Sequence, residues 1–171
     1  MIGLLTPAVV GSLLLATLST IADYVWFLNI PQHQVVSGSI HGATLFAALG
    51  AYLGWRKGKA GAGLLGGLLS GLAAALSFYV LAPVGGYNVM LVSWLLLWIL
   101  LAALQTYLDG RLDMAKALGR GIVTSIVAAL GFGVVLFQLY RGWPPETFPA
   151  FKHFVAWSMA YLPGLYVLLK R

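Results

Sequence analysis

Four residues of this sequence could do chemistry within an apolar environment. Asp23 lies near the end of the first apolar segment, and His41 lies about one helical turn inside the second. His153 opens the last apolar segment, and Trp157 follows four residues later on the same helical face. A carboxylate in a membrane-spanning helix costs a few kcal/mol and normally faces the bundle interior or a water-filled cavity. We therefore expect these four residues to bind a ligand together.

Other polar residues fall at the same end of the apolar segments. His33 lies in a predicted connection, and Asn88 is the first residue of the fourth apolar segment. Arg141 and Glu146 flank a connection stiffened by two prolines. Asn88, Arg141 and Glu146 are expected near the ligand. Arg141 and Glu146 either pair with each other or form a lid over the pocket mouth.

Several kinds of site are disfavoured by the sequence. The chain has no cysteine, which excludes disulfides, thiolate metal sites and cysteine nucleophiles. His33 and His41 are too far apart on one helix to share an ion, and no His-x-x-x-His or Glu-x-x-His motif is present. No serine-nucleophile or nucleotide-binding motif is found either. We predict no metal site, and the cofactor, if any, is unknown.

Composition shows which elements must position these residues. The chain of 171 residues is 61% hydrophobic and 8% charged, whereas soluble domains carry about 25% charged residues. Six apolar stretches are each long enough to cross a hydrocarbon core of about 30 Å as a helix: 2–28, 35–55, 60–82, 88–108, 119–140 and 150–169. The sequence predicts an all-α integral membrane protein with six transmembrane helices and one domain, 1–171.

The positive charges predict an orientation. Six spans place eight of the ten Lys and Arg residues on one side; they are Arg56, Lys57, Lys59, Arg111, Lys116, Arg120, Lys170 and Arg171. Only Arg141 and Lys152 fall on the other side. The positive-inside rule then puts both termini in the cytoplasm of a multi-pass protein, which we assign to the plasma (inner) membrane. The same rule explains the net charge of +6 without nucleic acid. The N-terminus has no basic region typical of a cleaved signal peptide.

An internal repeat is also indicated. Tyr-Leu pairs recur at Tyr52, Tyr107 and Tyr161, and the third and fifth segments carry small residues at four-residue spacing, which allow close helix packing. A proline follows each odd-numbered segment. We predict three tandem helical hairpins, 1–58, 59–115 and 116–171, related by pseudo-threefold symmetry. The alternative is a chance match in a chain rich in Leu, Ala and Gly.

Three classes of function remain open. A protein that binds or transports a small solute predicts a hydrated cavity enclosed by the first, second and sixth helices. A membrane enzyme acting on a lipid or quinone-like substrate predicts Asp23 or Glu146 within hydrogen-bond reach of His41 or His153. A structural subunit of a larger complex predicts a simply solvated Asp23. Expected partners are the bilayer, a small-molecule or lipid ligand, and a membrane or cytoplasmic protein.

Overall fold

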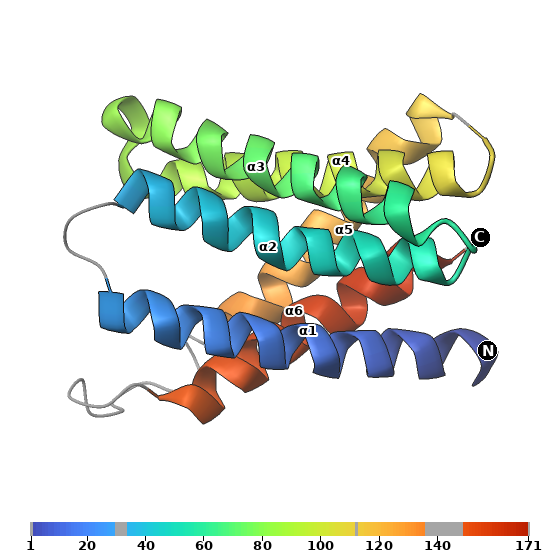
Figure 1. Cartoon of the computed structure of the whole chain (residues 1–171), viewed down its shortest axis with the longest axis horizontal. Helices are drawn as coiled ribbons and strands as arrows, with labels where there is room; N and C mark the ends of the chain where they lie inside the picture. Colours follow the sequence, from blue (N-terminus) through green and yellow to red (C-terminus); the bar gives the residue numbers. More distant parts are fainter. Residues whose placement is uncertain (1, 30–33, 112, 136–148, 171) are drawn as a thin grey trace.

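The computed structural model describes residues 2–29, 34–111, 113–135 and 149–170. Within these ranges the fold is entirely helical. It comprises α1 (Ile2–Asn29), α2 (Gln34–Trp55), α3 (Ala60–Gly85), the short 3₁₀ turn η1 (Gly86–Val89), α4 (Met90–Leu108), α5 (Met114–Gly133) and α6 (Ala150–Leu169). The helices run up and down, so both ends of the chain lie at one end of the bundle (Figure 1).

Five of the described helices, α1 to α5, are long and apolar enough to cross a membrane. This composition and architecture support a multi-pass membrane protein. The 20-residue α6 is also long enough to span, but its sequence includes Lys152, His153 and Trp157. These polar and aromatic residues lower the mean hydropathy of α6. Two of them, His153 and Trp157, are predicted site residues.

Three predicted helix boundaries are wrong. The third helix continues through Pro83 to Gly85, and η1 precedes a fourth helix that starts at Met90 rather than at residue 88. Pro83 therefore lies inside α3. A transmembrane helix can tolerate a proline, because only one backbone N–H donor is lost. The fifth helix starts at Met114, five residues earlier than predicted, because Asp113 caps it by accepting a hydrogen bond from the Lys116 backbone N–H at 2.9 Å.

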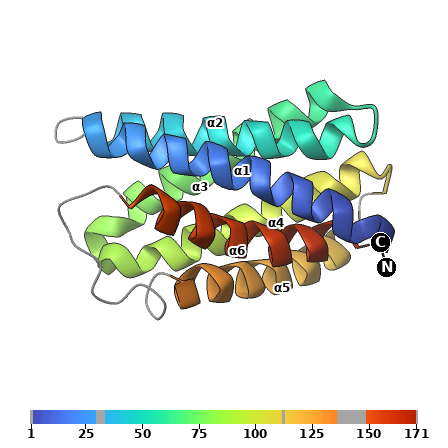
Figure 2. The same ribbon diagram turned by 90° about the horizontal axis from the view of Figure 1, so that it is seen from below.

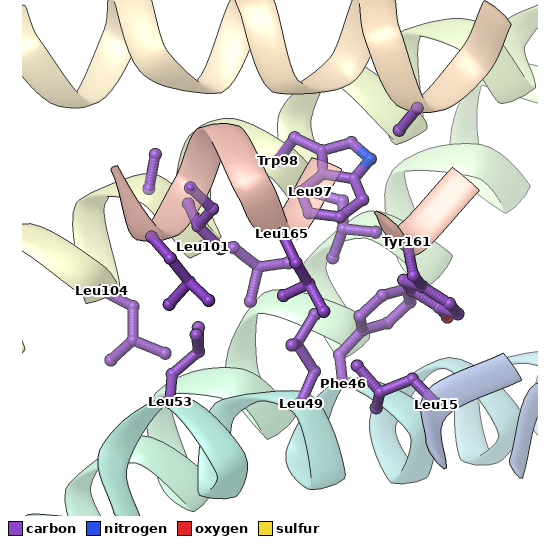
Figure 3. Close-up of a cluster of buried hydrophobic side chains, with 14 of the residues drawn as sticks. Leu15, Phe46, Leu49, Leu53, Leu97, Trp98, Leu101, Leu104, Tyr161 and Leu165 are labelled. Carbon is purple, nitrogen blue, oxygen red and sulfur yellow. The ribbon is translucent and has the colours of Figure 1, made fainter. Parts of the chain in front are cut away.

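The large side chains of the core come mainly from the even-numbered helices (Figure 3). They include Phe46, Leu49 and Leu53 of α2, Leu97, Trp98 and Leu101 of α4, and Tyr161 and Leu165 of α6. Apart from Leu15, the odd-numbered helices contribute only alanines to this core. Their leucine, valine and isoleucine side chains are largely exposed on the outside, where lipid would contact them.

The tightest helix contact joins α2 and α3 through glycine. A Cβ atom on Gly50 would collide with the Gly63 carbonyl oxygen, and one on Gly71 would collide with the Gly42 carbonyl oxygen. Gly67 likewise approaches the backbone of Gly50. The predicted use of small residues in the third helix is confirmed, because only glycine allows two helix backbones this close.

The helices close into a ring. Each helix packs against the next one in sequence, and α1 packs extensively against α6 (Figure 2). The even-numbered helices also meet across the ring, because α4 contacts both α2 and α6. Closure brings the first and last helices side by side.

Candidate functional site

The inward face of α1 leads to Asp23. Ser12, Ala16 and Ser19 are buried, and the Asp23 side chain is 19% exposed. This small and polar face of α1 points into the bundle. The carboxylate therefore sits where protein groups, rather than bulk water, must supply most of its partners.

Two residues of α6 bind one oxygen of this carboxylate. His153 Nδ1 lies 2.8 Å from Asp23 Oδ2, and Trp157 Nε1 donates to the same oxygen at 2.6 Å. One helical turn separates the two α6 residues, so both side chains reach the same point on α1. The structure thus brings together three of the predicted site residues.

His41 approaches the other carboxylate oxygen from α2. Its Nε2 atom lies 3.7 Å from Asp23 Oδ1, which is beyond hydrogen-bond distance. When His41 is protonated, its positive charge is attracted to the carboxylate. Asp23 therefore lies between two helices, bound tightly to α6 and loosely to α2.

The hydrogen bonds define the chemistry of His153. When Asp23 is ionised it can only accept hydrogen bonds, so His153 Nδ1 carries a proton and donates a hydrogen bond to Asp23. The basic nitrogen of a neutral His153 is then Nε2. A carboxylate that orients a histidine in this way is suited to binding and exchanging protons.

A second polar contact joins α1 and α6 next to this site. The Ser19 and Tyr161 hydroxyl groups lie 2.9 Å apart and are both buried. Ser12 donates to the Ser158 carbonyl oxygen at 3.4 Å. Together with Asp23, these contacts form a line of polar groups along the α1–α6 interface.

Aromatic rings from three helices back the polar cluster. Trp157 stacks on Tyr161 with ring centroids 5.6 Å apart, and it lies 4.7 Å from Phe132 and 6.2 Å from Trp94. Trp94 and Phe132 were not predicted from the sequence. Both lie in apolar runs, and only the packing of α4 and α5 against α6 brings them to Trp157.

Of the remaining predicted site residues, the structure describes only Asn88. Asn88 is exposed in η1 and is not among the described partners of Asp23. Arg141, Glu146 and His33 lie outside the described residues, so their predicted roles stay predictions. Among the described residues, no group of three His, Cys, Asp or Glu could hold a metal ion.

Two cavities outlined by the described residues lie at the opposite end of the bundle. One of about 480 Å³ is lined by residues of the α2–α3 and α4–α5 connections, the end of α4 and the first half of α5. Another of about 360 Å³ lies between α5 and α6. In comparisons with protein-family models, curated proteins and solved structures, nothing matches the chain.

Proposed function

We propose that this protein binds and transports a small solute at the site formed by Asp23, His41, His153 and Trp157. The proposal rests on the Asp23 carboxylate. This charged group lies in the apolar helix α1 and accepts hydrogen bonds from two side chains of α6. Ionisable groups in such positions mark substrate or ion pathways and proton relays. A solvated Asp23, as expected of a structural subunit, would not need these partners.

The geometry favours a solute with a hydrogen-bond donor or a positive charge. Asp23 Oδ2 already accepts from His153 and Trp157, whereas Oδ1 has His41 at 3.7 Å. A donor group of a solute would bind Oδ1 between α1 and α2. The side chains of Asp23, His41 and His153 are 19%, 22% and 29% exposed, so a solute can reach them.

The packing supports movement at this position. The α2 helix packs far more closely on α3 than on α1, and α1 packs mainly on α6. Tyr52 of α2 donates a hydrogen bond to the Pro7 carbonyl oxygen of α1 near the other end of these helices. Separation of α2 from α1 at the Asp23 end would open the site to one side of the membrane, which resembles the rocking of helical bundles in transporters.

A membrane enzyme is the second candidate, because the 2.8 Å contact between Asp23 and His153 meets the expectation for an acid–base pair. Its substrate would be lipid-like or quinone-like and would enter from the bilayer. His153 Nε2 would act as the base. In both candidates the same carboxylate and histidine are essential.

The proposal includes the topology. All six helices cross the plasma (inner) membrane, the end with both termini is cytoplasmic, and the Asp23 site opens outwards. The partition of Lys and Arg between the two ends supports this orientation. The three-hairpin repeat also stays a prediction, supported by the large core residues on even-numbered helices and the alanines on odd-numbered ones.

The test is to purify the protein and identify co-purifying small molecules by absorbance and mass spectrometry. Binding should be lost in Asp23→Asn and His41→Ala and retained in Asp113→Asn, which removes a carboxylate at the other end. Unchanged binding in both site variants contradicts the site assignment. In proteoliposomes, a transporter moves the compound unaltered, whereas an enzyme converts it.

A further inference from the structure

A basic cavity lies at the end of the bundle that carries the termini. The cavity of about 480 Å³ there is lined by five basic side chains, namely Lys57, Lys59, Arg111, Lys116 and Arg120. Asp109 and Asp113 are the two carboxylates in its lining. The cavity therefore carries an excess of three positive charges.

Both carboxylates have other roles. Asp109 forms an ion pair with Lys57, which is the one salt bridge among the described residues of this lining. Asp113 caps α5 through the Lys116 backbone N–H. Among the described residues, neither carboxylate forms an ion pair with Arg111 or with the Lys116 ammonium group.

Two of the cations are held in place by helix ends. Lys59 Nζ donates to the Leu108 carbonyl oxygen at 3.0 Å, and Arg120 Nη1 donates to the Leu168 carbonyl oxygen at 3.4 Å. These contacts satisfy carbonyl groups that a helix C-terminus leaves unpaired. They also fix the cationic groups at the cavity wall, so an anion would meet an ordered set of donors.

An apolar groove adjoins this basic cavity through Arg120. The groove of about 360 Å³ is lined by residues of α5 and α6 that are mostly uncharged; they are Gly119, Arg120, Val123, Tyr166, Val167 and Lys170. An inorganic phosphate would use only the basic cavity. An anionic phospholipid would use both, with its headgroup phosphate among the cations and an acyl chain along the groove.

We propose that this basic cavity and apolar groove bind an anionic phospholipid through its phosphate group. Basic pockets between transmembrane helices at the cytoplasmic side are suited to such headgroups. Arg111, Lys116 and Arg120 bind the phosphate oxygens, and Val123, Tyr166 and Val167 contact the acyl chain. The site is separate from Asp23 and does not depend on the function proposed for that cluster.

The test measures lipid binding to the full chain in neutral detergent by native mass spectrometry and by the shift in unfolding temperature. Phosphatidylglycerol is the probe, and phosphatidylcholine and glycerol phosphate are the comparisons. We expect phosphatidylglycerol to bind more tightly than either. Each of Arg111→Gln and Lys116→Gln should weaken its binding about fivefold.

Arg56→Gln is the matched control, because Arg56 is exposed in the α2–α3 connection but does not line the cavity. This variant should bind phosphatidylglycerol as tightly as the unaltered protein does. Added salt should also weaken phosphatidylglycerol binding to the unaltered protein, a measurement that needs no variant. Equal binding of phosphatidylglycerol and phosphatidylcholine, or no loss in the two cavity variants, would overturn the proposal. Binding of glycerol phosphate as tight as that of the lipid would assign the site to soluble phosphate esters instead.

Discussion

Asp23 must obtain from a few side chains the hydrogen bonds that water would otherwise supply. His153 and Trp157 provide two of them to one oxygen. Bonds to a charged group are stronger than those between neutral groups. Trp157 therefore has two separable roles, as a hydrogen-bond donor and as part of the aromatic cluster with Phe132 and Tyr161.

Trp157→Phe separates these roles, because phenylalanine keeps an aromatic ring and removes the Nε1 donor. We expect a loss of about 1.5–3 kcal/mol in unfolding free energy, the range for hydrogen bonds to charged groups. Denaturation in detergent micelles measures it. Trp55→Phe is the control, since Trp55 is 70% exposed, and it should change stability by less than about 0.5 kcal/mol. Equal effects of the two substitutions would show that the bond to Asp23 contributes nothing.

The buried Ser19–Tyr161 contact makes a different prediction. Ser19→Ala leaves the Tyr161 hydroxyl buried without its partner, and Tyr161→Phe does the same to Ser19. Each single variant should lose about 1–3 kcal/mol. The double variant should be more stable than the sum of the two losses implies, because no unsatisfied hydroxyl remains. A double-mutant cycle measures this coupling, and strictly additive losses would contradict it.

Part of the site could be predicted from single residues, and part could not. Asp23 was identified by its cost in an apolar segment, and the four-residue spacing of His153 and Trp157 placed them on one face. Their common attachment to one Asp23 oxygen depends on the packing of the first helix against the last. Sequence periodicity shows which residues share one face of a helix, but it does not show which other helix packs against that face. For this reason Phe132, whose ring meets Trp157 only across the α5–α6 contact, was missed.

At the scale of elements, apolar length predicted the existence of the helices better than their ends. The fifth helix illustrates the reason. Lys116 precedes the predicted fifth segment, 119–140, although it lies in the first turn of α5. A helix that emerges from hydrocarbon can continue with charged residues, because its backbone hydrogen bonds remain satisfied within the helix. Hydropathy marks where lipid contact ends, whereas the Asp113 cap marks where the helix begins.

The glycine contact between α2 and α3 predicts the effect of a single methyl group. In Gly67→Ala, the new Cβ would meet the Phe46 carbonyl oxygen and lie 2.8 Å from the Gly50 Cα atom. Backbone atoms cannot move aside without separating the helices, so we expect a loss of about 1–3 kcal/mol. The unfolding midpoint in detergent measures it.

Gly61→Ala is the matched control in the same helix. A Cβ on Gly61 meets nothing within 4 Å, and alanine favours the helix by up to about 1 kcal/mol over glycine. This variant should be as stable as the unaltered protein or more so. If Gly61→Ala and Gly67→Ala destabilised the protein equally, the cause would be helix propensity or lipid contact, and close packing of α2 on α3 would not explain it.

At the scale of the whole molecule, the two ends of the bundle differ in chemistry. One end carries Asp23 with its histidines, and the other carries the basic cavity. Our proposals for both sites depend on which end faces the cytoplasm. Under the proposed topology of six crossings, only one orientation puts nearly all of the positive charge inside. An orientation test therefore bears on solute access and on lipid binding together.

The chain lacks cysteine, so single introduced cysteines can report the orientation. Ala60 starts α3 and Asn88 lies in η1 just beyond its other end, and both are exposed. In intact cells a membrane-impermeant maleimide should label Asn88→Cys and not Ala60→Cys, because positive-inside orientation puts residue 60 in the cytoplasm. Permeabilisation should make Ala60→Cys reactive, which shows that the thiol is accessible. The reverse pattern in intact cells would place the termini outside, and the Asp23 site would then open to the cytoplasm.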